Sequence, residues 1–414
     1  MKRAVITGIG AVTPIGNNIS ELWSALTIGK SGAAAITRFD PANHKTRFAC
    51  EVKGFDPLQY MEKQEARRMD MYTQFAIAAT DECLKDSGIN LEACDRNRIG
   101  VIVATGIGGM LTFEEEVLSF GANGGIPRFS PFFVTKMIPN ISSGQISIRY
   151  GLHGISYSIA SACASSNNAI ANALDHIRLG RADIVITGGS ESPISEASIG
   201  GFNSIKALST FNESPETASR PWDKNRDGFV IGEGSGILMV EELEHALNRG
   251  AKIYCELAGY GAASDAYNLV ATHPEGLGAI LAMNGAMEDA GISKNDVSYI
   301  NAHATSTTIG DISECKAIEV VFGEQVSKIS ISATKSQTGH MLGAAGAVEA
   351  IACIKSIETG LIHPSINLYE IDPELNPLFD FTPLKARKRE VLVALNNTFG
   401  FGGHAVTTAF KKYQ

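Results

Sequence analysis

The chain has 414 residues, of which 44% are hydrophobic and 19% are charged, and its formal net charge is −9. This length exceeds one ordinary hydrophobic core, so we expect two fused globular units. The acidic balance argues against general nucleic-acid binding, and no stretch approaches the roughly 18 apolar residues of a membrane span.

Short runs rich in β-branched residues alternate with longer helical patterns. The predicted strands, in chain order, are Ala4–Thr7, Ile99–Ala104, Ser156–Ala160, Ile184–Thr187, Ile237–Glu241, Ile253–Tyr260, Val297–Ala302, Ile329–Ala333 and Val391–Asn396. The predicted helices are Ser20–Ile28, Asp70–Ser87, Gly144–Arg149, Asn167–Leu179, Leu243–Arg249, Gly278–Ala290, Ile312–Phe322 and Ala344–Thr359. This alternation predicts an α/β protein whose sheets are buried between helices.

A weak internal repeat divides the chain near residue 250. A strand, a polar loop and a helix rich in small residues follow one another around Cys163, and the same order returns at Ile329–Ile354. Such self-similarity is typical of duplicated structural units. We therefore predict two similar α/β halves, 1–250 and 251–414, with an insertion at about 110–150 in the first half.

The cysteines indicate a reduced, cytoplasmic protein. They are scattered, without a C-x-x-C pair, at Cys50, Cys83, Cys94, Cys163, Cys255, Cys315 and Cys353. This pattern favours free thiols over a disulfide framework. The apolar run at the N-terminus is broken by Gly8, Gly10 and Pro14, so it predicts a buried strand and turn rather than a signal peptide.

Cys163 lies between the apolar run Ile155–Ala160 and the predicted helix Asn167–Leu179, among small residues. At a helix N-terminus, unpaired backbone N–H groups and the helix dipole favour the thiolate over the thiol. The same N–H groups can bind an oxyanion. A buried structural role is the commoner fate of a free cysteine, so position alone gives only a modest preference for a nucleophile.

Three loops of the second half follow predicted strands and are polar or rich in glycine: Asn301–Thr307, Lys335–His340 and Phe399–His404. Loops at strand ends are where α/β proteins tend to build sites. The first two loops carry His303 and His340, and they parallel the loop that carries Cys163. This arrangement favours one site shared by the cysteine and both histidines over separate structural roles.

Metal and nucleotide sites are less favoured interpretations. Zinc binding by Cys163 and the two histidines is conceivable from ligand types, but structural zinc sites usually contain short-range ligand pairs. The segment Asp223–Gly228 resembles the start of a calcium loop, yet Gly234 stands where a glutamate is needed. Gly8-Ile9-Gly10 is not completed to a dinucleotide-binding motif. We therefore expect no metal ligand set.

With these segments identified, the chain closely resembles a β-ketoacyl-acyl carrier protein synthase of the type II elongating class. The resemblance runs from Val5 to the C-terminus. It is carried by Cys163 in SACASS, His303 in NAHATST, and the segments KSQTGH, GFGGH and RPWDKNRDGFVIGEG. The order Cys–His–His separates the elongating class from initiating synthases, which use Cys–His–Asn, and from thiolases, which use two cysteines and a histidine.

The resemblance implies a thiolase-type fold, with two βαβαβαββ halves in a five-layered α-β-α-β-α arrangement, and a homodimer. It implies an acyltransferase that joins an acyl thioester to malonyl-acyl carrier protein by decarboxylative Claisen condensation. The product is 3-oxoacyl-acyl carrier protein, in the elongation step of type II fatty acid synthesis. Acyl carrier protein is the expected partner and brings its substrates on phosphopantetheine, and no cofactor of the enzyme itself is expected. Ala304, Thr308 and Ala405 replace a more usual glycine, proline and asparagine, and none of these changes removes a reacting group.

The resemblance also implies roles for individual residues. Cys163 would hold the acyl group, and neutral imidazoles of His303 and His340 would stabilise the enolate that forms on loss of CO2. Lys335 would act electrostatically, through Glu349 or Glu314, and its charge and burial would keep both imidazoles neutral. The N–H groups of Cys163 and Phe401 would form an oxyanion hole.

The remaining expected site residues fall into three groups. Substrate binding is expected at Thr305, Thr307, Ile107, Phe401 and Gly402, with Phe401 also as a gate; support at Glu349, Glu314 and Asp311; and docking of the acidic carrier protein at Arg67, Arg68, Arg128 and Lys206.

Three other functions are compatible with parts of this pattern. A ketosynthase of polyketide assembly would use the same chemistry on another substrate. A non-catalytic partner subunit that shapes chain length usually lacks the nucleophile, so Cys163 counts against it. A cysteine-dependent acyl hydrolase would need a route for water, and its two histidines would have no decarboxylation to support.

Overall fold

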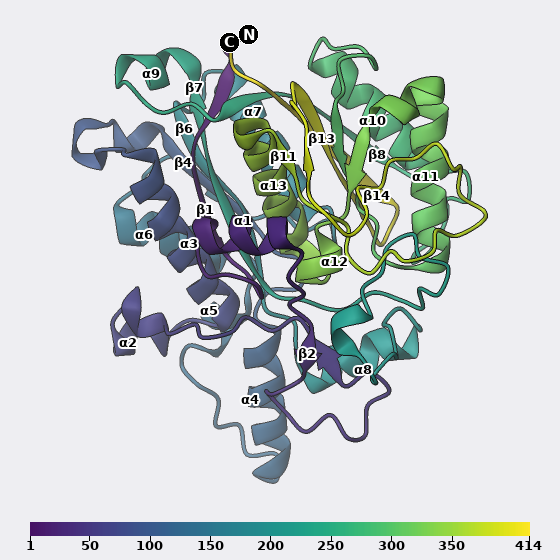
Figure 1. Cartoon of the computed structure of the whole chain (residues 1–414). Helices are drawn as coiled ribbons and strands as arrows, with labels where there is room; N and C mark the ends of the chain where they lie inside the picture. The colour runs from purple at the N-terminus through teal and green to yellow at the C-terminus, as the bar shows by residue number, and fades with distance from the viewer.

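Ten strands form one hydrogen-bonded sheet in the computed structural model, which describes all residues, 1–414 (Figure 1). The first five strands are β1 Ala4–Val12, β4 Ile99–Ala104, β5 Ser156–Tyr157, β6 Ile184–Glu191 and β7 Gly234–Glu242. The other five are β8 Cys255–Ser264, β9 Tyr299–Asn301, β10 Ser330–Ser332, β13 Val393–Gly400 and β14 His404–Lys411. Two small sheets pair β2 Ala34–Ala35 with β3 Phe48–Ala49, and β11 Leu361–Ile362 with β12 Arg387–Lys388.

Helices connect these strands. In the first part of the chain they are α1 Ile19–Ile28, α2 Lys63–Ala66, α3 Met71–Ser87, α4 Met110–Ala122, α5 Phe133–Met137, α6 Ile141–Tyr150, α7 Ser165–Arg178, α8 Glu196–Ser204 and α9 Leu243–Asn248. In the second part they are α10 Leu277–Asp289, α11 Thr308–Phe322, α12 Lys335–Thr338 and α13 Ala345–Thr359. No helix combines the length and the apolar character that a membrane crossing requires.

The strand order repeats. β4 is parallel to β5 and β6, β6 is antiparallel to β7, and β7 is antiparallel to β1. In the second part, β9 is parallel to β10 and β13, β13 is antiparallel to β14, and β14 is antiparallel to β8. The two sets join through the antiparallel pair β1–β8 at Val5–Glu256 and Ile6–Cys255. We propose that these sets are the cores of two halves divided near residue 250.

Helices on both faces of each set complete five layers. α7 and α13 pack against each other and against strands of both sets, so they form the central layer (Figure 1). α3 and α6 lie over the first set, and α10 covers β8 and β14 with α11 beside it. Each set reads βαβαβαββ along the chain once the additional helices are set aside. The expected α/β class and the five-layered arrangement are confirmed.

Small residues explain why α13 can occupy the central layer. Most of the helix is buried, including Ala347 and Ala350 at 0% exposure. At Gly346 an added Cβ would lie 2.8 Å from Asn167 Oδ1 of α7 and 2.9 Å from Thr398 Cγ2 of β13. The alanine and glycine content of this segment therefore reflects close packing on both sides of the helix.

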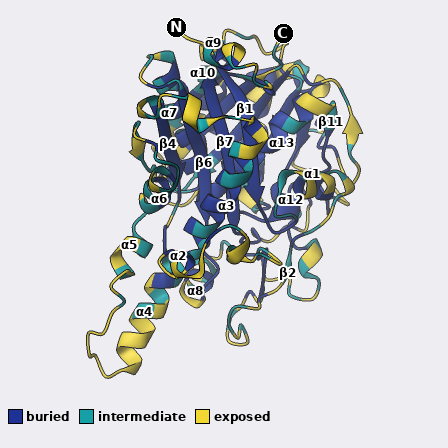
Figure 2. Ribbon diagram, turned by 90° about the vertical axis from the view of Figure 1, so that its left-hand side faces the viewer, coloured by how far each residue is buried: buried dark blue, intermediate teal, exposed yellow.

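The segment expected as an insertion contains three helices with different surroundings. α4 extends away from the layered body and is largely exposed, as its yellow colour in Figure 2 shows. α5 follows it on the same side, whereas α6 packs on β4 and α3. Exposed apolar side chains of this region include Phe113, Val117, Leu118, Phe129 and Val134.

The contact between β1 and α3 yields a test of the fold. An added Cβ at Gly10 would lie 2.7 Å from Cys83 N and closer still to Ala79 O, so Gly10→Ala forces the helix off the strand. Overpacking of this kind costs about 3 kcal/mol, and we expect a clearly lower midpoint of thermal unfolding by circular dichroism. Gly121→Ala, in exposed α4 with no atom within 4 Å, is the matched control and should leave the midpoint unchanged or slightly raised. Equal midpoints for the two variants would contradict this packing.

Candidate active site

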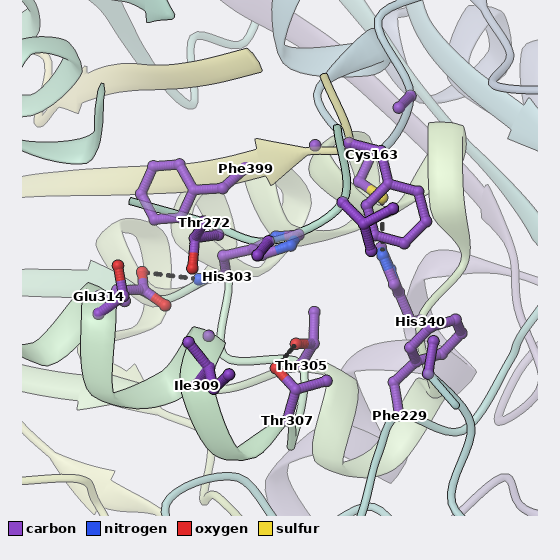
Figure 3. Close-up of a pocket in the computed structure, with 18 of the residues that line it drawn as sticks. Cys163, Phe229, Thr272, His303, Thr305, Thr307, Ile309, Glu314, His340 and Phe399 are labelled. Carbon is purple, nitrogen blue, oxygen red and sulfur yellow. Dashed lines mark hydrogen bonds between the residues drawn. The ribbon is translucent and has the colours of Figure 1, made fainter. Parts of the chain in front are cut away.

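A cavity of about 460 Å³ lies where loops from both parts of the sheet meet. Cys163, His303 and His340 all line it (Figure 3). Ile107, from the loop after β4, lines it as well. Other residues of the wall include Phe202, Phe229, Thr305, Thr307, Leu342, Phe399, Gly400 and Phe401. The three groups that the sequence places far apart thus surround one cavity.

A strained turn presents Cys163 two residues before α7. Ala162 has a φ of 50°, in the left-handed region that non-glycine residues rarely adopt. Ser165 Oγ holds the turn closed: it accepts from Ser161 N at 2.8 Å and donates to Ala162 O at 2.6 Å. The turn therefore keeps the thiol on the cavity wall at the N-terminus of the helix.

The two imidazoles approach the thiol from different loops. His340 Nε2 lies 3.0 Å from Cys163 Sγ. The rings of His303 and His340 are 5.3 Å apart between centroids and nearly perpendicular, at 87°. Phe399 packs against His303 and Phe229 packs against His340, with centroids 5.6 and 5.2 Å apart. Aromatic packing fixes both rings while their cavity-facing edges stay available (Figure 3).

Both histidines are neutral near pH 7. Burial lowers the pKa of His303 well below its ordinary value, and Lys335 and His340 lower it further. The pKa of His340 falls for the same reasons, burial first and Lys335 second. A neutral imidazole keeps one N–H to donate and one lone pair to accept. This state is the one expected from the sequence.

The pKa of the Cys163 thiol differs from the one expected at a helix N-terminus. Burial raises the pKa of Cys163 to about 12, although Lys335 and the N–H groups of Phe401 and Cys163 act to lower it. The expected preference for the thiolate is therefore wrong for the resting site, because desolvation outweighs the helix terminus. His340 Nε2 is the acceptor in contact with the thiol, at 3.0 Å from Sγ.

Lys335 forms a buried ion pair with Glu349 of α13, and both side chains are 1% exposed. Of the two partners left open by the sequence, Glu349 is the one in contact. Glu314 instead accepts from the backbone N–H of His303 at 2.9 Å and of Ala304 at 2.8 Å. Its pKa rises to about 7 because it is buried, and its contacts hold the loop that carries His303.

Asp311 supports the far end of the same loop. Its carboxylate accepts from Ser306 N at 3.1 Å and from Trp222 N at 2.9 Å, and Arg226 Nε lies 3.5 Å away. Burial raises its pKa to about 6. The expected supporting carboxylates thus contact the segments that carry His303 and Lys335, each at a different place.

The glycine-rich end of β13 passes beside the turn that carries Cys163. An added Cβ at Gly400 would lie 3.0 Å from Cys163 N and 2.9 Å from Ser161 O, so only glycine permits this approach. The next residue, Phe401, lines the cavity, whereas Gly402 does not and donates its N–H to Leu269 O at 2.8 Å. The structure therefore does not support the expected contact between Gly402 and the substrate.

The remaining expected residues separate into two groups. Thr305 and Thr307 line the cavity with their hydroxyl oxygens 3.0 Å apart, and exposed Lys206 also belongs to the wall. Arg67, Arg68 and Arg128 are exposed but lie outside the cavity wall, and the Arg68 guanidinium sits 5.3 Å from the Phe132 ring centroid.

Several residues of the site were missed in the sequence. Phe202 belongs to α8, where Gly200 and Gly201 obscure the helical pattern. Leu342 has a φ of 45°, which its sequence does not signal. Glu191 is the last residue of β6 and belongs to no recognised motif. The one signal in the sequence is a charged residue at the end of a buried strand.

Comparisons with known proteins agree over the whole chain. Residues 1–246 match the family model described as "Beta-ketoacyl synthase, N-terminal domain", and residues 254–369 match "Beta-ketoacyl synthase, C-terminal domain". A 3-oxoacyl-[acyl-carrier-protein] synthase 2 of Synechocystis sp. is 45% identical over 413 residues, which cover 100% of this chain and 99% of that protein.

Solved structures give the same picture. A β-ketoacyl synthase from Burkholderia phymatum STM815 superposes with a TM-score of 0.93 at 32% identity, and both chains are covered completely. A ketosynthase solved with its type II polyketide acyl-carrier protein, and bound to the hexaketide, superposes with a TM-score of 0.92 at 33% identity, again over 100% of each chain.

The protonated thiol predicts the pH dependence of Cys163 alkylation. Because its pKa is raised to about 12, the thiolate fraction and the iodoacetamide rate should grow about tenfold per pH unit from about pH 7 to about pH 9. Peptide mass spectrometry separates this label from that of Cys94, the one free cysteine that is not buried, and Cys163→Ala gives the background. A rate that levels off near neutral pH would show a thiolate already present.

Proposed function

This chain belongs to the β-ketoacyl synthase family, and from that premise we propose that its cavity joins an acyl group held on Cys163 to malonyl-acyl carrier protein. The reaction is the decarboxylative condensation that yields 3-oxoacyl-acyl carrier protein, the elongation step of type II fatty acid synthesis. The observation that carries the assignment of roles is the 3.0 Å contact between Cys163 Sγ and His340 Nε2, with His303 facing the same cavity.

In the first step, Cys163 Sγ attacks the carbonyl of the thioester that joins the acyl group to acyl carrier protein. Its proton passes to His340 Nε2, and the N–H groups of Cys163 and Phe401 bind the oxyanion. Collapse of the intermediate forms the acyl–enzyme thioester and expels the pantetheine thiolate, which takes the proton back from His340. The raised pKa of Cys163 supports this order, since proton loss accompanies attack.

In the second step, the malonyl thioester loses CO2. Its bonding electrons move into the thioester to form an enolate. The negative oxygen accepts N–H bonds from His303 and from His340, whose neutral ring must by then carry its proton on Nε2. Each such donor contributes about 3 kcal/mol if oxyanion-hole magnitudes apply. The lowered pKa values of both histidines support this role, because a neutral imidazole donates without having to lose a positive charge first.

In the third step, the enolate carbon attacks the acyl carbonyl and forms the new carbon–carbon bond. Cys163 leaves as a thiolate beside the Lys335 charge and then takes up a proton from solvent, which the overall reaction consumes. Thr305 and Thr307 line the approach and would hydrogen-bond the phosphopantetheine arm. The steps use only side chains and backbone groups, so we propose no cofactor beyond the arm carried by the partner.

Acyl carrier protein is the proposed partner, and the related ketosynthase solved with its own carrier protein supports this assignment. A homodimer is proposed as well, because the exposed apolar side chains around α4 and α5 form a surface of the kind that protein contacts cover. Seven free cysteines support a reducing, cytoplasmic location. Fatty acid elongation is favoured over polyketide assembly by the higher identity, 45% against 33%.

Removing either imidazole tests the decarboxylation step. We expect His303→Ala and His340→Ala each to lower CO2 release from malonyl-acyl carrier protein at least about 100-fold, because the enolate loses a donor. Acyl loading of Cys163, followed by intact mass, should be largely retained in His303→Ala and slower in His340→Ala, which lacks the acceptor for the thiol proton. CO2 release is measured from carboxyl-labelled malonyl groups, and release at the wild-type rate by either variant would overturn the role of that histidine.

Charge reversal tests docking of the acidic carrier protein. Arg67→Glu with Arg68→Glu should raise KM for carrier-bound substrate about tenfold through repulsion, while alkylation of Cys163 by a small reagent is unchanged. The control is Lys385→Glu with Lys388→Glu, two exposed lysines outside the cavity wall. An equal KM for both double variants would remove Arg67 and Arg68 from the docking surface.

A further inference from the structure

Glu191, the last residue of β6, carries a fully buried carboxylate that makes no ion pair. Of the other buried carboxylates near the cavity, Glu349 faces Lys335 and Asp311 faces Arg226, whereas Glu314 also lacks an ion pair and anchors the His303 loop by hydrogen bonds. A buried charge without a counter-ion is costly unless hydrogen bonds replace its hydration. Its retention beside the cavity therefore calls for a specific role.

Four donors surround the carboxylate. Oε1 accepts from Thr105 Oγ1 at 2.7 Å and from Ile107 N at 3.1 Å. Oε2 accepts from Gly106 N at 2.6 Å and from Gly343 N at 2.9 Å. Three of the donors belong to the loop after β4, and the fourth belongs to the segment after His340. One side chain therefore ties together two loops that are far apart in the sequence.

Both loops belong to the cavity. Gly106 and Ile107 line it from one side, and Leu342 lines it next to Gly343. The loops touch so closely that an added Cβ at Gly343 would lie 2.6 Å from Glu191 Oε2 and 2.7 Å from the Thr105 carbonyl carbon. An added Cβ at Gly106 would lie 3.6 Å from Ala162 O, in the turn that carries Cys163.

Building on the proposed function, we propose that Glu191 is a positioning residue that fixes the acyl-pocket wall at Ile107 against the segment that carries His340. An acyl chain on Cys163 long enough to reach Ile107 meets a wall held by this carboxylate. An acetyl group ends before it. Glu191 thus acts on the seating of longer chains and leaves the reacting groups themselves in place.

The charge of Glu191 adds a second consequence. It raises the pKa of Cys163, against the effect of Lys335. The geometric and the electrostatic effects can be separated by two substitutions. Glu191→Asp keeps the charge, but its side chain is one methylene too short to accept from all four donors. Glu191→Gln removes the charge and places an amide NH2, which can only donate, where a carboxylate oxygen accepted from N–H donors.

The test compares kcat/KM for acetyl- and decanoyl-acyl carrier protein in condensation with malonyl-acyl carrier protein. Both Glu191 variants should lose about tenfold on the decanoyl substrate and less than about twofold on the acetyl substrate. Cys163 alkylation at pH 8 should be severalfold faster in Glu191→Gln and unchanged in Glu191→Asp. Glu241→Gln alters another fully buried carboxylate, which lies outside the cavity wall, and is the control. It should change neither the decanoyl-to-acetyl ratio of kcat/KM nor the rate of Cys163 alkylation.

Thr105→Val provides a milder variant if the Glu191 variants do not fold, since it removes one donor and leaves the charge in place. It should shift the decanoyl-to-acetyl ratio in the same direction. Equal losses on both substrates, or no loss on either, would overturn the positioning role. A wild-type enzyme that condenses neither substrate would instead overturn the proposed function, so the two failures are distinguishable.

Discussion

The buried ion pair between Lys335 and Glu349 sets the electrostatics of the whole cavity. Its cation lowers the pKa of Cys163, His303 and His340 together, although only Glu349 touches it. Burying two charges has a large desolvation cost, so such a pair is weak evidence for stability alone. Here its cation adds to the effect of burial in keeping the two imidazoles neutral, and it opposes the effect of burial on the thiol. Burial alone would keep the thiol protonated and unreactive. The nearby cation opposes this effect of burial on the thiol pKa, and His340 can then remove the thiol proton.

The two-part architecture explains how the cavity is assembled. Cys163 belongs to the loop before α7, while His303, Lys335 and His340 belong to the second part of the chain, in the loop after β9, in α12 and just after α12. α7 and α13 lie between the sets. Asn396 Nδ2 of β13 donates to Asn167 Oδ1 of α7 at 2.9 Å, and Asn167 Nδ2 donates to the backbone carbonyl of Asn396 at 3.0 Å. Glu314 and Asp311 then anchor one histidine loop from α11. Because carboxyl ends of strands from both sets point to one region, residues separated by more than a hundred positions share one wall.

Much of this could be predicted from the sequence, for physical reasons that differ between residues. The β-branched runs of β1, β4 and β6 and the small residues of α13 follow directly from burial on both faces, and the α/β class was predicted correctly. β14 was missed because its threonines make His404–Lys411 look polar, although Thr407 is buried and bonds to Asn397. α4 and α8 were missed because exposure or paired glycines hide their periodicity.

The thiol pKa was misjudged because a sequence reveals the helix terminus but not the depth of burial. Glu191 and the turn at Ala162 depend on contacts between distant loops, which no local pattern encodes. The roles of the catalytic residues stay predictions.

The central claim is that Cys163 holds the acyl group while the two histidines serve the malonyl group. It is tested most directly by intact-mass analysis after incubation with acyl-acyl carrier protein alone, followed by addition of malonyl-acyl carrier protein. The account predicts one stable acyl adduct, absent from Cys163→Ala, that persists until the malonyl substrate arrives and then leaves as 3-oxoacyl-acyl carrier protein. Release of the adduct as free acid without the malonyl substrate, or an adduct on another cysteine, would contradict it.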